Sequence, residues 1–287
     1  MPEILSEIGF AKINLALHVR ERLANGYHRL ETVFAFVDDG DRLTVEAGAE
    51  GAIECTVYGR FADELARQGS ASDNLVVRAA LALQTECGTR QGACFRLEKR
   101  LPVASGIGGG SADAAAALRL LNRLWRLDWP LDRLAQVGLS LGADIPACVF
   151  SQTMRGEGIG ENLSPWPDSG LAGRPVLLVN PLRPISTASV FAAWDGVDRG
   201  GMTSSPDAIG AARAGRNDLQ PMAEQMVPEI TEILGLLENC NPELARMSGS
   251  GATCFALFET LDDVMAAQES IEAHLPGAWT MAGRLRA

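Results

Sequence analysis

Apolar and polar side chains alternate at several places in the first sixty residues. The first of these stretches carries an aliphatic residue at every second position: Ile13, Leu15, Leu17 and Val19. Two shorter stretches with the same alternation, 43–45 and 53–57, lie on either side of the glycine-containing segment 48–51. A period of two is typical of β-strands that bury one face. We therefore expect a β-rich N-terminal layer.

The other face of the first predicted strand carries Lys12, Asn14, Ala16 and His18. A lysine and an asparagine two positions apart on a strand point to the same side, so they can project together into a cleft. A solvated sheet face gives the same pattern. The alternation alone leaves both interpretations open.

Helical periodicity follows in three stretches. The first, 75–83, comes directly after Asp73 and Asn74, either of which is a suitable helix cap. The second, 114–125, places its apolar side chains on one face of the helix. The third, 131–141, begins after a proline that breaks the chain.

Strand and helix patterns alternate in the second half of the chain. A short strand of the buried type is expected at 175–179, a helix start at 186–191, apolar helices on both sides of Pro228, and a strand at 254–258 followed by a further helix. This order predicts an α+β or split βαβ layer. The segment 195–214 is rich in Gly, Ser, Ala and Asp, and we expect it to be a mobile surface excursion.

A glycine-rich segment, Leu101 to Asp113, lies between the strand expected at 94–99 and the helix at 114–125. Such a junction directs unpaired N–H groups and the positive end of the helix dipole at one point, and glycines let an anion approach the backbone. A phosphate is the expected ligand. The alternative is a flexible turn in which Ser111 is an ordinary N-cap.

Familiar nucleotide-binding motifs do not account for this loop. The chain has no G-x-x-x-x-G-K-[ST] sequence and no G-x-G-x-x-G near its first strand, so neither a Walker loop nor a Rossmann unit is indicated. A second glycine-containing loop, Met247 to Thr253, opens onto the strand at 254–258. It is either a tight turn or part of a site.

Asp144 stands in the sequence Gly142-Ala143-Asp144-Ile145-Pro146. Gly142 suits a left-handed residue at the end of the preceding helix, and Pro146 disfavours helical geometry at Ile145. These neighbours predict a stiff elbow at the negative end of a helix, where an aspartate does not stabilise the dipole. The constraint favours a catalytic role over that of an ordinary loop residue.

Composition narrows the classes of function. The 287 residues allow one large or two modest domains, and no apolar run approaches the roughly eighteen residues that cross a bilayer. With no leader-like N-terminus, a cytoplasmic protein without a membrane partner is expected. The formal net charge of −11 argues against nucleic acid as a partner. A phosphate ligand must then be neutralised locally, by N–H groups, a few basic side chains and a metal ion.

The six cysteines are scattered and form no C-x-x-C pair: Cys55, Cys87, Cys94, Cys148, Cys240 and Cys254. This spacing indicates neither a zinc site nor a disulfide framework. We expect reduced thiols in mostly apolar surroundings.

Five motifs taken in order give the chain a resemblance to a known family. They are Lys12-Ile13-Asn14-Leu15, Gly26-Tyr27-His28-Arg29-Leu30-Glu31-Thr32, the Pro102 to Ser111 loop, Leu141-Gly142-Ala143-Asp144-Ile145-Pro146, and Ser248-Gly249-Ser250-Gly251-Ala252. This order resembles that of the GHMP kinases, which phosphorylate small metabolites, and it covers essentially the whole chain. The loop differs in one respect, because Ala104-Ser105 stands where the family often has further glycines.

The resemblance implies a two-domain α+β GHMP kinase fold, with a β-rich N-terminal domain over 1–155 and a ferredoxin-like C-terminal domain over 156–287. ATP and Mg²⁺ are the implied cofactors, although no metal ligand is identified. Lys12 and Asp144 look like the catalytic pair, with Asp144 as the base. The residues implied to bind the nucleotide are Asn74, Lys99, Pro102, Val103, Ala104, Ser105, Gly106, Ile107, Gly108, Gly109, Gly110, Ser111 and Ala112.

Within the family, the Tyr27-His28 pair resembles the branch whose substrate is an alcohol linked to cytidine diphosphate. The residues implied to bind that small molecule are Asn14, Tyr27, His28, Thr187, Phe191, Ser248 and Gly249. Tyr27 and Phe191 are predicted to stack on the cytosine and His28 to read its edge. A homoserine or mevalonate kinase and a non-catalytic nucleotide sensor are the alternatives. A monomer or weak homodimer is expected.

Overall fold

Two long strands, β1 (Leu5–Arg22) and β2 (His28–Gly48), pair with each other and run through both of the compact units that the chain forms. The computed structural model describes residues 3–67, 69–166, 170–203, 205 and 207–287. The first unit comprises the chain up to residue 11 with 39–103 and 108–151, and the second comprises 12–38, 104–107 and 152–287. The units interleave along the chain, and the domain division at residue 155 stays a prediction.

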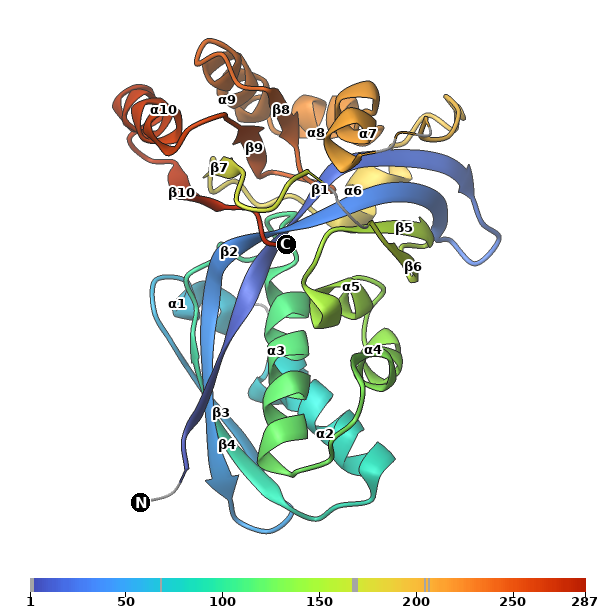
Figure 1. The fold of residues 1–287 in the computed structure, drawn as a ribbon, viewed down its shortest axis with the longest axis vertical. Helices are drawn as coiled ribbons and strands as arrows, with labels where there is room; N and C mark the ends of the chain where they lie inside the picture. The colour runs from blue at the N-terminus through green and yellow to red at the C-terminus, as the bar shows by residue number, and fades with distance from the viewer. Residues whose placement is uncertain (1–2, 68, 167–169, 204, 206) are drawn as a thin grey trace. The chain divides into compact units, whose positions relative to one another are not determined.

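The first unit combines a sheet with helices, as Figure 1 shows. Its elements besides β1 and β2 are β3 (Ile53–Tyr58), α1 (Ala62–Ala66), the short 3₁₀ helix η1 (Ala71–Asp73), α2 (Leu75–Cys87), β4 (Gly92–Glu98), α3 (Gly109–Leu124), α4 (Leu131–Leu139) and α5 (Ile145–Phe150). β4 pairs antiparallel with β2 through 92–98 and parallel with β3. The periodicity of apolar residues in the sequence therefore predicted most of the strands and helices of this unit.

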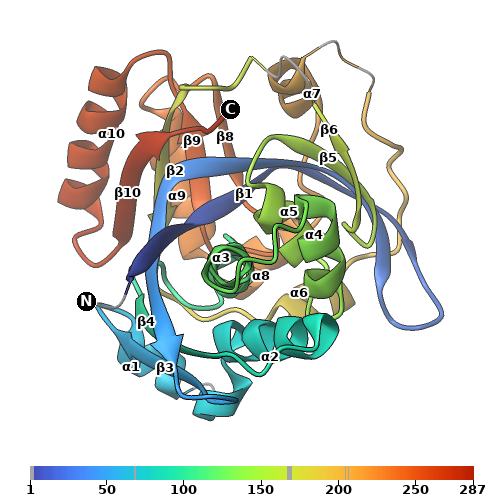
Figure 2. The ribbon, with the colours of Figure 1, turned by 60° about the horizontal axis from the view of Figure 1, so that its bottom comes forward.

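Helices α2 and α3 pack against each other in the first unit (Figure 2). The four consecutive alanines 114–117 of α3 are all buried, as are Ala79 and Ala80 of α2. Such small side chains let helix backbones approach closely. The Asn74 side chain caps α2 by accepting from the N–H of Val76 at 2.8 Å, which confirms one of the two caps expected from the sequence.

The second unit contains a four-stranded antiparallel sheet with the order β10-β7-β9-β8. Its elements are β5 (Met154–Gly158), β6 (Asn162–Pro165), β7 (Pro175–Asn180), α6 (Thr187–Ala192), α7 (Ala208–Ala214), α8 (Gln220–Met226), α9 (Glu229–Glu238), β8 (Leu244–Met247), β9 (Cys254–Leu257), α10 (Leu261–His274) and β10 (Trp279–Arg284). β10, the last strand of this sheet along the chain, pairs with β7, the first. Helices α9 and α10 pack on the sheet. This is the ferredoxin-like arrangement expected for the C-terminal domain.

An apolar core packs the sheet of the second unit against its helices. Leu177 and Val179 of β7 contribute to it with Ile230 and Ile233 of α9 and with Phe258, and all five are fully buried or nearly so. β5 and β6 extend the sheet of β2 through the pairing of residues 30–34 with 154–158. Strands β5, β6, β8 and β10 were not predicted from the sequence, because they are short and lack a clear alternation.

One alternative and two local expectations from the sequence were wrong. Helix α3 begins at Gly109 with Gly108 as its N-cap, which excludes the alternative in which Ser111 caps the helix. Gly142 does not adopt the left-handed conformation, since α4 ends at Leu139 with a right-handed cap residue. The segment 195–214 is not without structure, because α7 falls within it and buries three alanines. Positions 204 and 206 of this segment lie outside the described residues.

Candidate active site

The glycine-rich loop leaves the first unit after Val103 and re-enters it at Gly108. Gly106 has φ +78° and Gly108 has φ +66°, both in the left-handed region that side chains with a Cβ avoid. A Cβ on Gly106 would also lie 2.6 Å from the carbonyl oxygen of Ser248 and 2.7 Å from that of Gly251. The loop therefore requires glycine at 106 for two independent reasons.

The loop leads directly into the N-terminus of α3. Gly109 and Gly110 are the first two residues of this 16-residue helix. The N–H groups of a first helical turn have no partner within the helix, and the helix dipole adds positive potential there. This arrangement fits a phosphate group, as the sequence predicted.

Lys12 and Asn14 of β1 are both buried, and each residue is 3% exposed. This burial excludes the interpretation in which they lie on a solvated sheet face. The Nζ of Lys12 donates to Oδ1 of Asn14 at 2.8 Å and lies 5.3 Å from the centre of the Phe34 ring. Nδ2 of Asn14 donates to the Thr32 hydroxyl at 2.8 Å, and Thr32 donates to the carbonyl of Ala16 at 2.7 Å. This chain of bonds fixes the rotamer of Asn14.

Ser248 connects this face of β1 with the glycine-rich loop. Its hydroxyl accepts from the N–H of Asn14 at 3.1 Å and donates to the carbonyl of Gly106 at 3.0 Å. The N–H of Lys12 donates to the carbonyl of Ile107 at 3.0 Å. The second glycine loop is therefore part of the candidate site.

Asn217 holds the second glycine loop, and sequence reasoning missed it. Its Nδ2 donates to the carbonyls of Met247 and Gly249, both at 2.8 Å, while Oδ1 accepts from the N–H of Leu219 at 3.0 Å. The hydroxyl of Ser250 in this loop shares a hydrogen bond of 2.9 Å with the hydroxyl of Thr187, the first residue of α6. The Asn-Asp-Leu sequence at 217–219 carries no pattern that would have singled it out.

An aromatic cluster lies near the start of β2. The ring of His28 lies 5.1 Å from that of Phe191 and 5.7 Å from that of Trp194, edge-on to the latter. Its Nε2 accepts from Arg22 at 3.2 Å. Burial, and then the charge of Arg22, lower the pKa of His28, so it is neutral at pH 7. Tyr27 is 57% exposed.

Lys99 is buried, although the resemblance implies a position near the adenine. It donates to Oδ2 of Asp41 and, at 2.8 Å, to Oδ2 of Asp113. Burial alone would lower the pKa of Lys99, but the two carboxylates more than offset this and raise it. The lysine therefore remains charged within the first unit.

Asp144 immediately precedes α5, and Pro146 lies in the first turn of that helix. The expectation that Pro146 forces extended geometry on Ile145 was wrong, because proline fits a first turn, where its missing N–H is not needed. Asp144 thus stands at the positive end of a helix and not at the negative end. Since Lys12 belongs to the second unit and Asp144 to the first, their pairing stays a prediction.

A segment that follows α6 is fastened to β1 by polar contacts. The Nδ1 of His18 lies 3.3 Å from the carbonyl of Gly200, its Nε2 accepts from the N–H of Arg216 at 3.1 Å, and Arg20 binds Asp198 at 2.8 Å. Burial, followed by the charge of Arg216, lowers the pKa of His18. At least this part of the predicted mobile excursion is therefore tied to the sheet.

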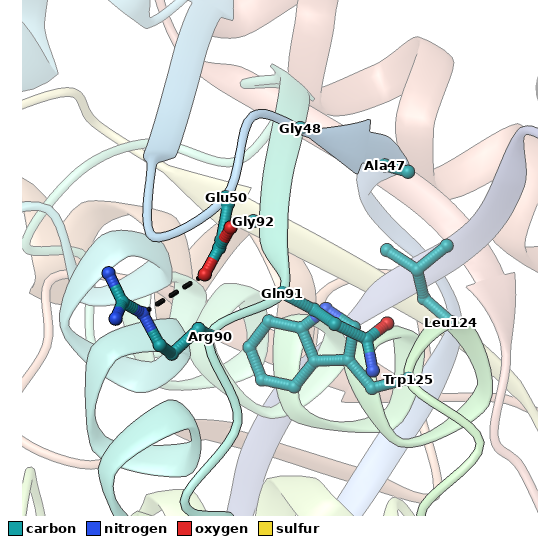
Figure 3. Close-up of a pocket in the computed structure, with 8 residues that line it drawn as sticks. All are labelled: Ala47, Gly48, Glu50, Arg90, Gln91, Gly92, Leu124 and Trp125. Atoms are coloured by element: carbon teal, nitrogen blue, oxygen red, sulfur yellow. Dashed lines mark ion pairs between the residues drawn. The ribbon is translucent and has the colours of Figure 1, made fainter.

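A cavity of about 400 Å³ lies elsewhere in the first unit (Figure 3). Its lining residues are Ala47, Gly48, Glu50, Arg90, Gln91, Gly92, Leu124 and Trp125. Arg90 forms an ion pair with Glu50 at 3.1 Å, and both side chains are largely exposed. None of the catalytic or ligand-binding residues predicted from the sequence lines this cavity.

The part of the chain that the structure describes also bears on metal binding, membrane spans and disulfides. No group of three or more His, Cys, Asp or Glu residues in it could hold a metal ion. No helix in it is long and apolar enough to span a bilayer. All six cysteines are free thiols; Cys148 and Cys254 are buried and the others are half-buried.

Family models match both halves of the chain. The GHMP kinases N terminal domain matches residues 74–152, and the GHMP kinases C terminal domain matches residues 204–277. Together with the fold and the glycine-rich loop, these matches define a small-molecule kinase of the GHMP class. The fold expected from the sequence is confirmed.

Sequence relatives indicate which GHMP kinases the chain resembles closely in sequence. The chain is 49% identical over 288 residues to the 4-diphosphocytidyl-2-C-methyl-D-erythritol kinase of Sphingopyxis alaskensis, with 100% of both chains covered. It is 49% identical over 282 residues to the enzyme of the same name from Rhizorhabdus wittichii, covering 98% of this chain and 94% of the relative. The chain belongs to the family of 4-diphosphocytidyl-2-C-methyl-D-erythritol kinases.

Solved structures agree. A crystal structure of 4-(cytidine 5′-diphospho)-2C-methyl-D-erythritol kinase matches with a TM-score of 0.80 at 31% identity, covering 99% of this chain and 100% of that one. A homoserine kinase from Cytophaga hutchinsonii matches with a TM-score of 0.70 at 14% identity, covering 96% of this chain and 95% of that one. The second match shows the shared fold alone.

Proposed function

We propose that this enzyme transfers the γ-phosphoryl group of ATP to the 2-hydroxyl of 4-diphosphocytidyl-2-C-methyl-D-erythritol. The product is the 2-phosphate, an intermediate of the non-mevalonate route to isopentenyl diphosphate. The observation that carries the proposal is the glycine-rich loop at the N-terminus of α3. The chain that contains this loop matches 4-diphosphocytidyl-2-C-methyl-D-erythritol kinases along essentially its full length.

In this proposal the loop residues 102–112 and Asn74 hold the nucleotide. Backbone N–H groups and the α3 dipole supply much of the charge compensation that a protein of net charge −11 must provide locally. Mg²⁺ is expected to enter on the phosphates of ATP, since Mg²⁺ commonly binds through few protein carboxylates and keeps several waters. It would add positive charge at the transferring phosphoryl group.

Lys12 and Asp144 are proposed as the catalytic pair. Asp144 takes the proton of the substrate hydroxyl, and Lys12 stabilises charge on the transferring phosphoryl group. The bond from Lys12 to Asn14 supports this role, because it fixes the ammonium group on the β1 face beside the Ser248 loop. Positioning and charge compensation are what in-line phosphoryl transfer requires.

The cytidine end of the substrate is proposed to bind at Tyr27, His28, Phe191 and Thr187. The packing of His28 on Phe191 and Trp194 supports this location. A histidine with a lowered pKa is neutral at pH 7 and presents ring nitrogens that suit the edge of a base. Asn14, Ser248 and Gly249 then face the polyol.

A coupled assay that follows ADP release tests the assignment directly. Turnover is expected with the diphosphocytidyl substrate and not with homoserine or mevalonate. Tyr27→Ala should raise the KM for the diphosphocytidyl substrate by roughly tenfold and spare the KM for ATP, because one base stack contributes about 1–3 kcal/mol. Turnover with homoserine or mevalonate at a comparable rate would contradict the proposal.

We further propose that the enzyme is cytoplasmic, has no nucleic acid partner and is a monomer or weak homodimer. The acidic net charge of −11 supports the absence of nucleic acid binding. Sedimentation analysis at micromolar concentration tests the oligomeric state.

A further inference from the structure

Three buried charged side chains of the first unit form a cluster at the base of the glycine-rich loop. Lys99 directly follows β4, Asp41 lies in β2, and Asp113 is the fifth residue of α3. Their side chains are 2%, 0% and 4% exposed. The ammonium group of Lys99 donates to both carboxylates.

The cluster reaches both ends of the loop. Oδ1 of Asp41 accepts from the N–H groups of Arg100 at 2.6 Å and Leu101 at 2.8 Å, which lead into the loop. At the other end, a Cβ on Gly109, the first residue of α3, would lie 3.1 Å from the Nζ of Lys99. The carboxylate of Asp41 thus binds the start of the loop, and the ammonium of Lys99 lies beside the first residue of the helix.

The hydrogen bonds of the two carboxylates are unequal. Asp41 accepts three, one from Lys99 and two from backbone N–H groups. Oδ2 of Asp113 accepts one, whereas Oδ1 has no hydrogen-bond partner within the described part of the chain and is buried. Two buried carboxylates beside one ammonium group would leave an uncompensated negative charge, which is costly in a protein interior.

We propose that Asp41, Lys99 and Asp113 form a buried, internally neutral cluster that positions both ends of the glycine-rich loop for the nucleotide. The two carboxylates share one proton, which resides mainly on Asp113. Burial, and to a smaller extent the charge of Asp41, raise the pKa of Asp113 against the opposing effect of Lys99. All three are positioning residues, and in this proposal Lys99 acts through the loop without contact between its ammonium group and the adenine. The inference rests on the proposed kinase function.

Three substitutions distinguish the members of the cluster. Asp41→Asn and Lys99→Met should raise the KM for ATP and the Kd for ADP by roughly tenfold to a hundredfold, because small misplacements of binding groups have effects of this size. The KM for the alcohol substrate should stay unchanged. Asp113→Asn keeps a neutral side chain that can accept from Lys99, so it should raise the Kd for ADP by less than Asp41→Asn or Lys99→Met does.

The matched control is Asp39→Asn. Asp39 binds Arg100 at 2.6 Å beside the same loop, but the two side chains are 30% and 35% exposed. Its loss should change the ADP Kd by less than about twofold, since exposed ion pairs contribute little. If Asp41→Asn lowers only the melting temperature and leaves ADP binding intact, the cluster is merely structural and the proposal fails.

The shared proton has a separate test that does not require Asp41→Asn to fold. A carboxyl with a raised pKa favours folding below its unfolded pKa, and this contribution is lost as pH rises through the folded value. The stability of the wild type should therefore fall with rising pH relative to Asp113→Asn. Parallel stability curves, or an Asp113→Asn variant as impaired as Asp41→Asn in ADP binding, would overturn the assignment.

Calorimetry with ADP separates this inference from the proposed function. Loss of ADP affinity in Asp41→Asn and Lys99→Met is expected whichever alcohol the wild type phosphorylates. A wild type that binds ADP but does not phosphorylate the diphosphocytidyl substrate would contradict the function alone. Unchanged ADP affinity in Asp41→Asn and Lys99→Met, in an active enzyme, would contradict the cluster alone.

Discussion

The glycine-rich loop at 101–108 and the loop at 248–251 are fixed by different chemistry. The first is fastened at its start by the carboxylate of Asp41, which a buried lysine compensates. The second is fastened by the neutral amide of Asn217 and the hydroxyl of Ser248. A buried charge is strongly destabilising once its partner is removed, whereas a lost amide bond has a smaller cost. Burial raises the pKa of Asp113, which shares Lys99 with Asp41. The free energy of unfolding should therefore depend on pH through the charged cluster beside the first loop, and not through the amide that holds the second.

The largest effect is expected on turnover, from a substitution that changes none of the side chains that hold the two loops. Asp144→Asn removes the proposed base, and a positioned base contributes roughly 10²–10⁴ in rate. Turnover should fall by that factor while ADP affinity stays close to the wild type, measured by the coupled assay and by calorimetry. Near-normal turnover would exclude Asp144 as the base.

Gly106→Ala breaks the contact between the glycine-rich loop and the second loop. The new Cβ would lie 2.6 Å from the carbonyl oxygen of Ser248 at a residue with φ +78°. Strain in the left-handed region and overpacking together should lower the free energy of unfolding by about 2–4 kcal/mol. Denaturant titration measures this loss, and weaker ADP binding should accompany it.

Gly110→Ala is the matched control for stability. Its Cβ would meet only the Cδ1 of Leu75, at 3.2 Å, and the residue lies in the first turn of α3. Alanine is the better helix former by roughly 1 kcal/mol, so the free energy of unfolding should not fall appreciably. An equal loss in both variants would contradict the assignment of the loss to the clash and the backbone strain at 106.

Asn217→Ala tests the amide fastening alone. It leaves the carbonyls of Met247 and Gly249 without their shared donor, so the free energy of unfolding should fall by about 1–3 kcal/mol. Because the amide does not titrate, the loss should be the same at pH 6 and pH 9. Asn217→Asp should be worse, since a carboxylate would face two carbonyl oxygens. A loss that varied with pH would contradict the contrast between the two loops.

Periodicity and glycine content were sufficient to predict the part of the site that is local in sequence. The β1 strand with Lys12 and Asn14 on one face, the loop at 101–108 and the helix behind it were all expected from patterns within about twenty residues. The structure adds that both faces of β1 are buried. Alternation cannot distinguish a solvated polar face from one buried by segments distant in the chain.

The residues that sequence reasoning missed owe their importance to contacts between distant segments. Asp41 meets Lys99 across 58 positions, and Asn217 meets Gly249 across 32. Trp194, which packs edge-on to His28, lies after a short helix with no motif around it. Neither spacing nor composition marks such residues, because their function depends on which strands and loops become neighbours.

The smallest effect concerns Ala104, an exposed loop residue with φ +48°. A left-handed alanine costs roughly 1–2 kcal/mol, while glycine loses more conformational entropy on folding by about 0.5–1 kcal/mol. Ala104→Gly should therefore stabilise the protein by less than about 1 kcal/mol, a rise of a few degrees at most in Tm. Calorimetric melting measures the shift.

The control for Ala104→Gly is Ala66→Gly, at an exposed alanine that is the last residue of α1. Glycine there should lower Tm, because it is the poorer helix former by about 1 kcal/mol. Opposite signs at the two alanines are the expected result. A fall in Tm for both would mean that the loop holds Ala104 without strain and that a glycine at position 104 gives no gain in stability.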